Sequence, residues 1–308
     1  MDSFEAPDLS VIVVVLGGGH ELVRCLEALR AQTNPPPMEV IVPHDDRLRE
    51  IDLPRQTSPA VKFLHLPGQH SYAELRAAGV RASRGRVVAV TEDQCIPPGT
   101  WCANVVCVHT NTHVAVGGPV EKLQPDSPLG WAIYLRELGT YMPPMPDGPS
   151  LHLTDCNVSY KRASLDSISG VWAKEFHEPQ VHEALRQRGG TLWLSPALLT
   201  YQHRSLRFVP ALKERYAFGR LFGSLRAAAV PRARRLLLVA VSLFLPALLV
   251  GRVLSSVLRK RRHRGACLVA LPYLIVFSIV WSWGEFLGYL TNRPAGYRSS
   301  PPLRAASE

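Results

Sequence analysis

LSVIVVVLGGG, from Leu9 to Gly19, is a short, continuous apolar run, rich in β-branched residues, that ends at three glycines. Apolar residues at consecutive positions over this length are typical of a strand buried on both faces of a parallel sheet. ELVRCLEALRA, residues 21–31, then has its apolar residues at helical spacing, and MEVIV, residues 38–42, returns to strand character. The three segments predict one β-α-β unit.

The same alternation continues along the chain. Residues 61–66 and RVVAVT, residues 86–91, are predicted strands, and residues 71–82, rich in Ala and Arg, are a predicted helix between them. Alternating strands and helices indicate an α/β domain in which a mainly parallel sheet lies between helices. We expect this domain to extend over residues 1–205.

The composition limits the class of protein. The chain has 308 residues, of which 46% are hydrophobic and 19% charged, and its formal net charge is +10. This fits one sizeable folded domain with a smaller part attached. The six cysteines form no CxxC pair and no zinc-like spacing with histidine, so the sequence argues against a zinc site and favours reduced thiols.

Beyond residue 205 the composition becomes that of a membrane-associated segment. Residues 206–235 are basic and amphipathic, a pattern suited to a membrane surface. Leu236–Leu258 and Ala266–Leu290 are apolar stretches. At about 1.5 Å per residue, each is long enough to cross about 30 Å of hydrocarbon.

The two apolar stretches are separated only by RKRRHRG, residues 259–265. Residues 236–290 are therefore predicted to form a transmembrane helical hairpin, and residues 291–308 a polar tail. Pro246 and Pro272, near the middle of each stretch, leave open a re-entrant hairpin. A buried hairpin in a soluble protein is the other alternative.

The basic residues predict an orientation. Nine Lys and Arg residues lie between Arg204 and Arg235, against five in the hairpin turn. By the positive-inside rule, this excess predicts that the first domain faces the cytoplasm at the cell (inner) membrane. Residues 1–9 are acidic and have no basic n-region, so no secretory signal is expected. Because many arginines cluster around the membrane segments, nucleic acid is not an expected partner.

Polar residues follow three of the predicted strands. They are Gly17–Gly19 after the first, Asp45 and Asp46 after the second, and Glu92-Asp93-Gln94 after RVVAVT. Ligands of open α/β sheets bind beyond the carboxyl ends of the strands. Carboxylate oxygens are also the ligands that Mg²⁺ and Mn²⁺ prefer, so the third group is a candidate cation site.

The order of these motifs resembles the family-2 glycosyltransferases, whose nucleotide-sugar-binding fold is called GT-A. The resemblance covers residues 9–205 and includes Glu92-Asp93-Gln94 followed by Pro97, Pro98 and Trp101. Further segments that carry it are GGPV at 117–120, TDCNVSYKR at 154–162, EFHEPQVHEALRQRGG at 175–190 and LSPALLTYQH at 194–203. WGEFLGYL, residues 283–290, is similar to the tail of membrane-bound members.

The resemblance implies a nucleotide-sugar site formed by Gly17, Asp45, Asp46, Arg76, Glu92, Asp93 and Asn157. Gly17 would let the backbone approach the nucleotide closely. Asp45 or Asp46 would accept hydrogen bonds from the base, and Arg76 would lie near the diphosphate. A turn aspartate and a solvated helix arginine are the structural alternatives.

The resemblance also implies a divalent cation, Mg²⁺ or Mn²⁺, that bridges the two phosphates, with Asp93, Gln94 and His203 as ligands. The family usually has Asp at the first and third positions of the motif, where this chain has Glu92 and Gln94. That departure leaves the ligands and the metal dependence open. A capping role for Asp93 and a structural role for His203 are the alternatives.

Glu178 is the candidate general base. Val181 and Leu185 share one helix face, and Glu178 comes just before that helix, where the family carries its acidic base. It would take the proton from the acceptor hydroxyl. The alternative is a helix-cap carboxylate, and Glu175 and His177 are the further candidates.

The expected enzyme is a hexosyltransferase-like glycosyltransferase. It would move one sugar from a UDP- or GDP-linked donor to a membrane lipid or a lipid-linked glycan, with inversion by direct displacement. The chain has no QxxRW sequence of the kind found in processive synthases, so a single addition is expected. Residues 124–148 could form an acceptor-side lid. The alternative is a degenerate GT-A scaffold that binds a nucleotide sugar or a membrane partner without catalysis.

Overall fold

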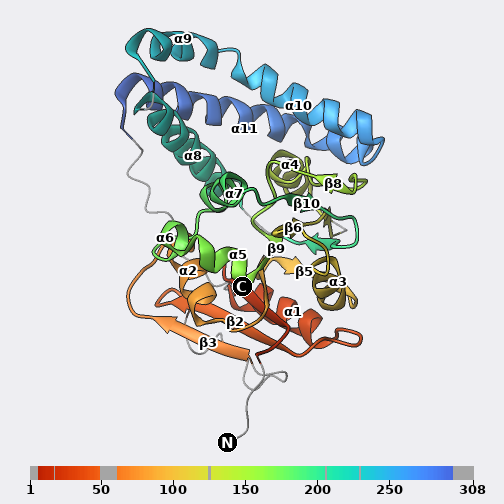
Figure 1. The fold of residues 1–308 in the computed structure, drawn as a ribbon. Coiled ribbons are helices and arrows are strands. Elements are labelled where there is room, and N and C mark those ends of the chain that lie inside the picture. The colour runs from red at the N-terminus through yellow and green to blue at the C-terminus, as the bar shows by residue number, and fades with distance from the viewer. Residues whose placement is uncertain are drawn as a thin grey trace, which may run out of the picture. The chain divides into compact units, whose positions relative to one another are not determined.

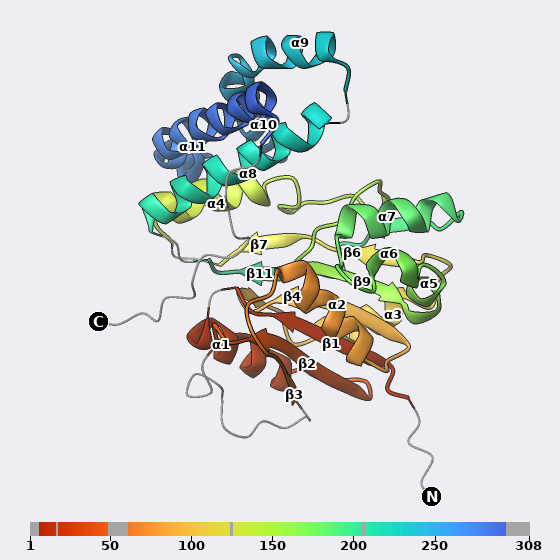
Figure 2. The ribbon, with the colours of Figure 1, turned by 90° about the vertical axis from the view of Figure 1, so that its left-hand side faces the viewer.

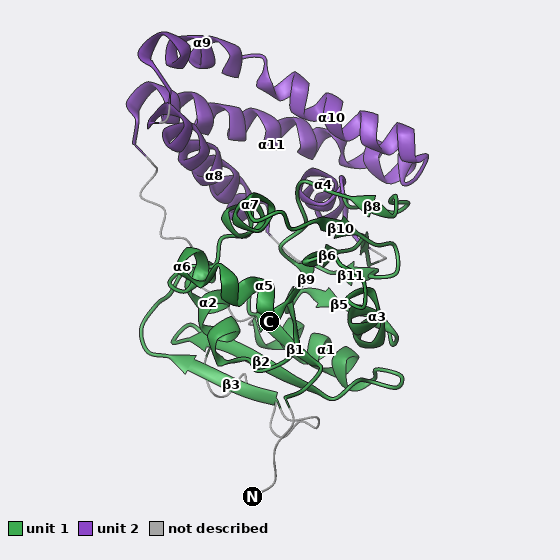
Figure 3. Cartoon of the chain, viewed as in Figure 1, with its two compact units in different colours: residues 1–123, 141–203, 300–308 green, residues 124–140, 204–299 purple. Residues whose placement is uncertain are grey.

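A computed structural model of the chain describes residues 6–16, 18–48, 61–123, 126–204, 207–228 and 230–293. Gly17 and residues 294–308 of the predicted tail lie outside the described residues. The chain divides into two compact units, which Figure 3 colours separately. Within the described residues, one unit holds 6–123 and 141–203, and the other holds 126–140 and 204–293.

The first unit is built on an eight-stranded sheet with the order β3-β2-β1-β4-β9-β6-β10-β8. Its strands are β1 (Leu9–Val14), β2 (Met38–Asp45), β3 (Val61–Leu66), β4 (Val87–Glu92), β6 (Ala115–Gly117), β8 (Gly148–Pro149), β9 (Asn157–Lys161) and β10 (Leu192–Leu194). Strands β3, β2, β1 and β4 are parallel neighbours; Figure 1 labels β2 and β3, and Figure 2 shows all four side by side. Strand β9 pairs antiparallel with both β4 and β6. The predicted α/β class and mainly parallel sheet are confirmed.

A small second sheet has the order β5-β11-β7. Its strands are β5 (Cys95–Ile96), β7 (Val120–Lys122) and β11 (Thr200–Gln202). Strand β5 begins three residues after β4 ends, so the Glu-Asp-Gln segment joins the two sheets.

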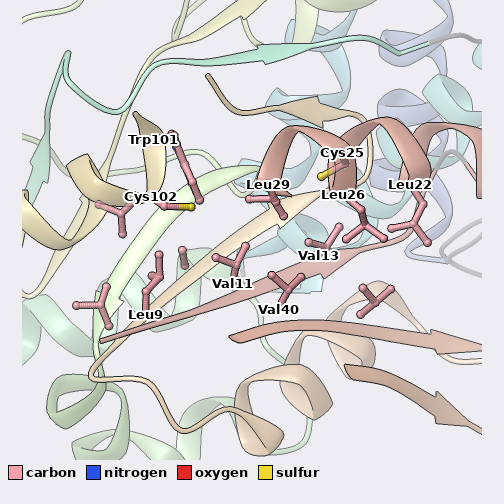
Figure 4. Packing of buried hydrophobic residues seen from close by; sticks show 14 of the residues in the cluster. Leu9, Val11, Val13, Leu22, Cys25, Leu26, Leu29, Val40, Trp101 and Cys102 are labelled. Carbon is pink, nitrogen blue, oxygen red and sulfur yellow. The ribbon is translucent and has the colours of Figure 1, made fainter. Parts of the chain in front are cut away.

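Strand β1 explains why its sequence is continuously apolar. Leu9, Val11 and Val13 belong to one core cluster, whereas Ile12 and Val14 belong to a second. Successive side chains of a strand point to opposite faces, so both faces of β1 are covered. Figure 4 shows the first cluster, in which β1 packs against α1 (Gly19–Arg30) and α3 (Trp101–Val108).

The second cluster lies under the other helices of this unit, α2 (Tyr72–Ala82), α5 (Arg162–Ser167), α6 (Ser169–Trp172) and α7 (Glu178–Gln187). Helix α2 begins with a capping box. The Glu74 N–H donates to Ser71 Oγ at 3.2 Å, and the Ser71 N–H donates to Glu74 Oε2 at 2.7 Å. This fixes the start of the helix that carries Arg76.

The second unit is entirely helical in its described residues. Its helices are α4 (Pro128–Glu137), α8 (Phe208–Ala228), α9 (Arg232–Ser242), α10 (Leu245–Lys260) and α11 (Arg264–Thr291). Helix α11 is long and apolar enough to cross a membrane and runs through Pro272 without a break. It matches the second predicted span.

The first predicted span is not one helix, and this corrects the simple hairpin. Leu236–Leu258 is divided between α9 and α10, which meet at an angle of 65° and together pass the length and hydropathy test. Pro246 lies in the first turn of α10. Proline has no N–H and its ring clashes with the carbonyl four residues earlier, so Pro246 favours a helix end just before it and a new helix that starts with it in the first turn. A broken span and a re-entrant loop both fit this geometry.

Candidate active site

Asp93 fixes the loop that follows β1. Its Oδ1 accepts the Leu16 N–H at 2.9 Å, and its Oδ2 accepts the Gly18 N–H at 3.0 Å. The side chain is 0% exposed. Both oxygens therefore hold the backbone at the carboxyl end of the central strand, where the fold places ligands.

Arg76 brings together two other predicted site residues. Its Nη1 lies 3.0 Å from Glu178 Oε1, and its Nη2 lies 3.1 Å from Glu92 Oε1. The guanidinium is buried, and burial alone would lower its pKa. Glu178 in the first place, with Asp155 and Glu92, outweighs burial and raises the pKa of Arg76, so this cation stays charged.

Asp155 is a third carboxylate at this arginine. Its Oδ2 lies 3.4 Å from Arg76 Nη2, and its side chain is 51% exposed. Three carboxylates from the end of β4, the segment before β9 and the start of α7 thus meet one guanidinium. The cluster carries an excess of negative charge when all three acids are ionised.

Glu178 is the first residue of α7 and is 8% exposed. Burial raises the pKa of Glu178 to about 7, against the opposing effect of Arg76 and with a further rise from Asp155. Although the ion pair is short, Oε1 accepts no well-aligned hydrogen bond. A carboxylate with a pKa near neutrality can accept a proton and release it again.

The core holds α7, and with it Glu178, in place. Val181 and Leu185 belong to the second core cluster, as the predicted helix face requires. His182 Nε2 and the Tyr160 hydroxyl lie 3.0 Å apart and are both buried. Burial lowers the pKa of His182 to about 4, so this histidine is neutral at physiological pH.

Asp45 and Asp46 lie at the end of β2 and differ in their surroundings. Asp45 accepts hydrogen bonds from the Arg47 side chain and from the His70 N–H. Burial alone would raise the pKa of Asp45, but these bonds outweigh it and lower the pKa. Asp46 is exposed, and the N–H of Gly68, at 2.7 Å, lowers its pKa. Asp46 is thus the more accessible of the two carboxylates.

Asn157 is buried and engaged on every side. Its Oδ1 accepts the Trp101 Nε1–H at 3.0 Å. Its Nδ2 donates to the carbonyl oxygens of Pro119 at 3.1 Å and Leu198 at 2.5 Å. These bonds tie β9 to α3 and to the segments before β7 and β11.

Gln94 and His203 are neighbours, because the His203 N–H donates to the Gln94 carbonyl at 2.9 Å. The ring Nδ1 of His203 lies 3.2 Å from Glu21 Oε1 and 3.2 Å from Arg24 Nη1. Gln94 Oε1 is buried and has no hydrogen-bond partner in the part of the chain that the structure describes.

A buried carboxylate and guanidinium lie beside the carboxyl ends of parallel strands, where sheets of this kind bind their ligands, and the sequence comparison identifies the family. The family model described as glycosyl transferase family 2 matches residues 10–169, a little over half of the chain. The chain belongs to glycosyl transferase family 2. Among curated proteins, the comparison finds no match.

Solved glycosyltransferase structures share the fold. The mannosyltransferase PcManGT from Pyrobaculum calidifontis, in complex with GDP-Man and Mn²⁺, has a TM-score of 0.50 and 15% identity, over 94% of this chain and 86% of that chain. GalNAc-T7 with UDP, GalNAc and Mn²⁺ has a TM-score of 0.48 and 14% identity, over 67% and 45%.

TarS 1-349 of S. aureus has a TM-score of 0.46 and 12% identity, with 70% of this chain and 64% of that chain covered. This family-2 chain thus spans less than two thirds of the TarS structure. At such identities a likeness is one of fold alone, and the mannosyltransferase structure, with its TM-score of 0.50, supports the GT-A architecture.

The contacts of the Glu-Asp-Gln segment decide whether the predicted ligands fit a divalent cation. Both Asp93 oxygens accept backbone N–H groups, and Glu92 pairs with Arg76. Within the described ranges, no three or more His, Cys, Asp or Glu side chains form a cation-sized group. Of the three predicted ligands, Gln94 has a buried side-chain oxygen, Oε1, with no hydrogen-bond partner among the described residues. As arranged, Asp93, Gln94 and His203 do not fit a Mg²⁺ or Mn²⁺ site.

Asp155 is the residue that sequence reasoning missed in this family-2 site. It lies in TDCNVSYKR, two positions before Asn157, which the resemblance did place in the site. A single carboxylate in a loop carries no periodic signal, and the partner that gives it significance is 79 residues away in sequence. Its proximity to the predicted Arg76 appears only after folding.

Proposed function

We propose that this chain transfers one sugar from a nucleotide-sugar donor, UDP- or GDP-linked, to a hydroxyl of a membrane lipid or a lipid-linked glycan. The observation that carries the proposal is the Arg76–Glu178 pair at 3.0 Å, with the pKa of Glu178 raised to about 7 by burial. Such a carboxylate is matched to general-base work at neutral pH.

Glu178 is the general base in this mechanism. Its carboxylate takes the proton of the acceptor hydroxyl while the acceptor oxygen forms a bond to the anomeric carbon. The bond from that carbon to the nucleoside diphosphate breaks, and its electron pair leaves with the diphosphate. A single displacement inverts the anomeric centre. Arg76 orients the base and favours its ionised form.

The donor would lie on the loop after β1. Asp93 presets this loop through the N–H groups of Leu16 and Gly18, and Gly17 stands between them in sequence. Asp46, exposed at the end of β2, is the candidate partner of the base. Asn157 and Asp45 hold neighbouring segments in place, since their polar atoms are occupied by protein groups.

The ligands of the solved structures support the choice of nucleotide classes. GDP-Man is bound in the mannosyltransferase structure and UDP in the GalNAc-T7 structure, and both contain Mn²⁺. A divalent cation remains a prediction of the family resemblance, because Asp93, Gln94 and His203, as arranged, do not fit a cation site. No step of the proposed mechanism passes through it.

The membrane part of the proposal rests on the helical unit. Among the described residues, every exposed large hydrophobic side chain except Leu151 and Val171 lies between Phe208 and Leu290. Apolar surface of this extent marks a membrane or protein contact. We place residues 236–290 in the cell (inner) membrane, 206–235 at its surface, and the 1–205 domain on the cytoplasmic side.

A degenerate scaffold is the second candidate. It is favoured by one observation: Glu92 Oε1 pairs with Arg76, and both Asp93 oxygens accept backbone N–H groups. A protein of this kind would bind a nucleotide sugar or a membrane partner and turn nothing over.

Donor binding and slow donor hydrolysis by the detergent-solubilised full chain separate the two candidates. A panel of UDP- and GDP-sugars is titrated calorimetrically, and free sugar is then measured for wild type, Glu178→Gln and Glu175→Gln. Glu175 is 54% exposed and pairs with His177, so it is the matched control. We expect Glu178→Gln to keep donor binding and lose at least about 100-fold in hydrolysis. Binding without hydrolysis by wild type would favour the scaffold.

A further inference from the structure

The helical unit carries an open groove of about 670 Å³ along one face of α10. It lies entirely within this unit and takes no part in the proposed sugar transfer. Its two ends differ in chemistry. Ala247, Leu248 and Gly251 line the end toward the start of α10, whereas the other end is lined by hydroxyl and cationic side chains.

The cationic end is formed by Arg252, Arg259 and Lys260, with Ser255 between the arginines. Arg252 and Arg259 are seven residues apart, so they share one helix face, two turns or about 10 Å apart along the axis. Arg252, Ser255 and Arg259 are all exposed. Two guanidinium groups and a hydroxyl on one face can hold a phosphate through several charge-assisted hydrogen bonds.

The wall of the groove is fixed by two hydrogen bonds to the end of the α4 segment. Ser256 Oγ donates to the Gly139 carbonyl at 3.0 Å, and Lys260 Nζ donates to the Thr140 carbonyl at 2.9 Å. Both carbonyls belong to the same compact unit as α10. The arginines therefore face a groove of defined shape.

We propose that this groove binds the phosphate headgroup of an anionic membrane lipid. The phosphate would lie against Arg252, Ser255 and Arg259, and the start of the acyl chains would lie against Leu248 and Gly251. An acidic peptide or free phosphate would leave the apolar end uncovered, whereas a phospholipid covers both ends. Exposed Phe244 and Leu258 on the same broken helix pair would enter the surrounding membrane.

Native mass spectrometry of the full chain in neutral detergent tests this site. The protein is mixed with equal amounts of dioleoyl phosphatidic acid and dioleoyl phosphatidylcholine, and the retained lipids are counted. With two arginine side chains and a hydroxyl at one headgroup, we expect wild type to retain phosphatidic acid at least about tenfold over phosphatidylcholine. Excess inorganic phosphate should not displace it, and displacement would overturn the lipid assignment.

Gly251→Glu is the most informative variant. A Cβ at Gly251 meets nothing within 4 Å, so the substitution fits and places a carboxylate between the apolar and cationic ends. We expect it to remove the preference for phosphatidic acid, whereas Gly251→Ala keeps it. A folded Gly251→Glu protein that keeps the preference would overturn the proposal.

A charge-matched pair of double variants tests the proposed lipid site without a substitution at Gly251. Arg252→Gln with Arg259→Gln should abolish the preference. Arg261→Gln with Arg264→Gln removes the same charge from exposed residues just outside the groove and should retain it. Equal losses in the two double variants would mean attraction by diffuse charge and would overturn the site. Circular dichroism confirms that each variant is folded.

Discussion

The candidate active site is organised around one arginine that contacts several acids. Arg76 contacts Glu92, Asp155 and Glu178, and burial makes the contacts with Glu92 and Glu178 stronger than they would be in water. Of these four residues, the sequence motifs predicted three. Asp155 was not predicted, because no neighbouring residue in the sequence indicates that folding brings it to Arg76.

Removing the charge of Arg76 should alter how Glu178 titrates. Arg76 opposes the rise in the pKa of Glu178, so Arg76→Met should raise that pKa further and move the acid limb of donor hydrolysis to higher pH. Arg76→Lys, which keeps the charge, should move the limb less. The pH dependence of kcat/KM for both variants measures this. A limb that stays in place in Arg76→Met would show that the two residues are not coupled.

Gln94→Asp tests the cation prediction at a single atom. The buried Gln94 Oε1 has no hydrogen-bond partner in the described residues, and a carboxylate there would give a hard cation a charged oxygen. We expect Gln94→Asp to bind Mn²⁺ at least about tenfold more tightly than wild type, as measured by water-proton relaxation. Gln94→Leu is the control and should bind no better than wild type. Equal Mn²⁺ affinity of wild type and Gln94→Asp would show that the side chain at position 94 is not a cation ligand.

Among the elements, the sequence predicted those whose pattern is local and missed those set by distant contacts. Strand β1 could be predicted because a strand that is buried on both faces needs a continuous apolar run, and its sequence has one. Helix α4 was placed in the first domain, where chain order puts it. Its grouping with the C-terminal helices depends on contacts such as Arg136 over the Trp281 ring at 5.0 Å, which no local pattern shows.

Helices α8 and α11 approach each other through glycines. A Cβ at Gly223 would lie 2.3 Å from the Glu285 carbonyl oxygen, and a Cβ at Gly284 would lie 2.3 Å from the Tyr216 carbonyl oxygen. Since these obstacles are backbone atoms, any larger residue forces the helices apart.

Gly223→Ala should therefore destabilise the helical unit by about 1–3 kcal/mol, the usual effect of overpacking. Gly251→Ala meets open space on α10 and should be neutral or stabilising by up to about 1 kcal/mol. Thermal unfolding in detergent, followed by circular dichroism, compares the two. A Gly223→Ala protein as stable as wild type would contradict the close packing.

For the whole molecule, we propose a cytoplasmic family-2 domain followed by a helical unit in the membrane. The sequence predicts this organisation from composition and charge, and the structure divides the first predicted span just before Pro246. Orientation in the membrane depends on the distribution of basic residues along the chain and on the membrane that receives the chain. It is therefore tested in cells.

Cys107 is a natural probe of orientation. It is exposed on the first unit, whereas the other five cysteines are buried. In intact cells a membrane-impermeant maleimide should leave Cys107 unlabelled, and it should label Cys107 in inside-out vesicles. Cys107→Ser is the control for labelling elsewhere. Labelling of Cys107 in intact cells would place the domain on the opposite side.

The pH dependence of donor hydrolysis tests the proposed general base most directly. With the pKa of Glu178 raised to about 7, the base is protonated and inactive below that pH and ionised above it. The rate for wild type should therefore rise about tenfold per pH unit up to about pH 7 and then level off. Glu178→Gln should be slow and lack this limb. A wild-type profile that is flat between pH 5 and pH 8, or a limb that persists in Glu178→Gln, would contradict the assignment of Glu178 as the base.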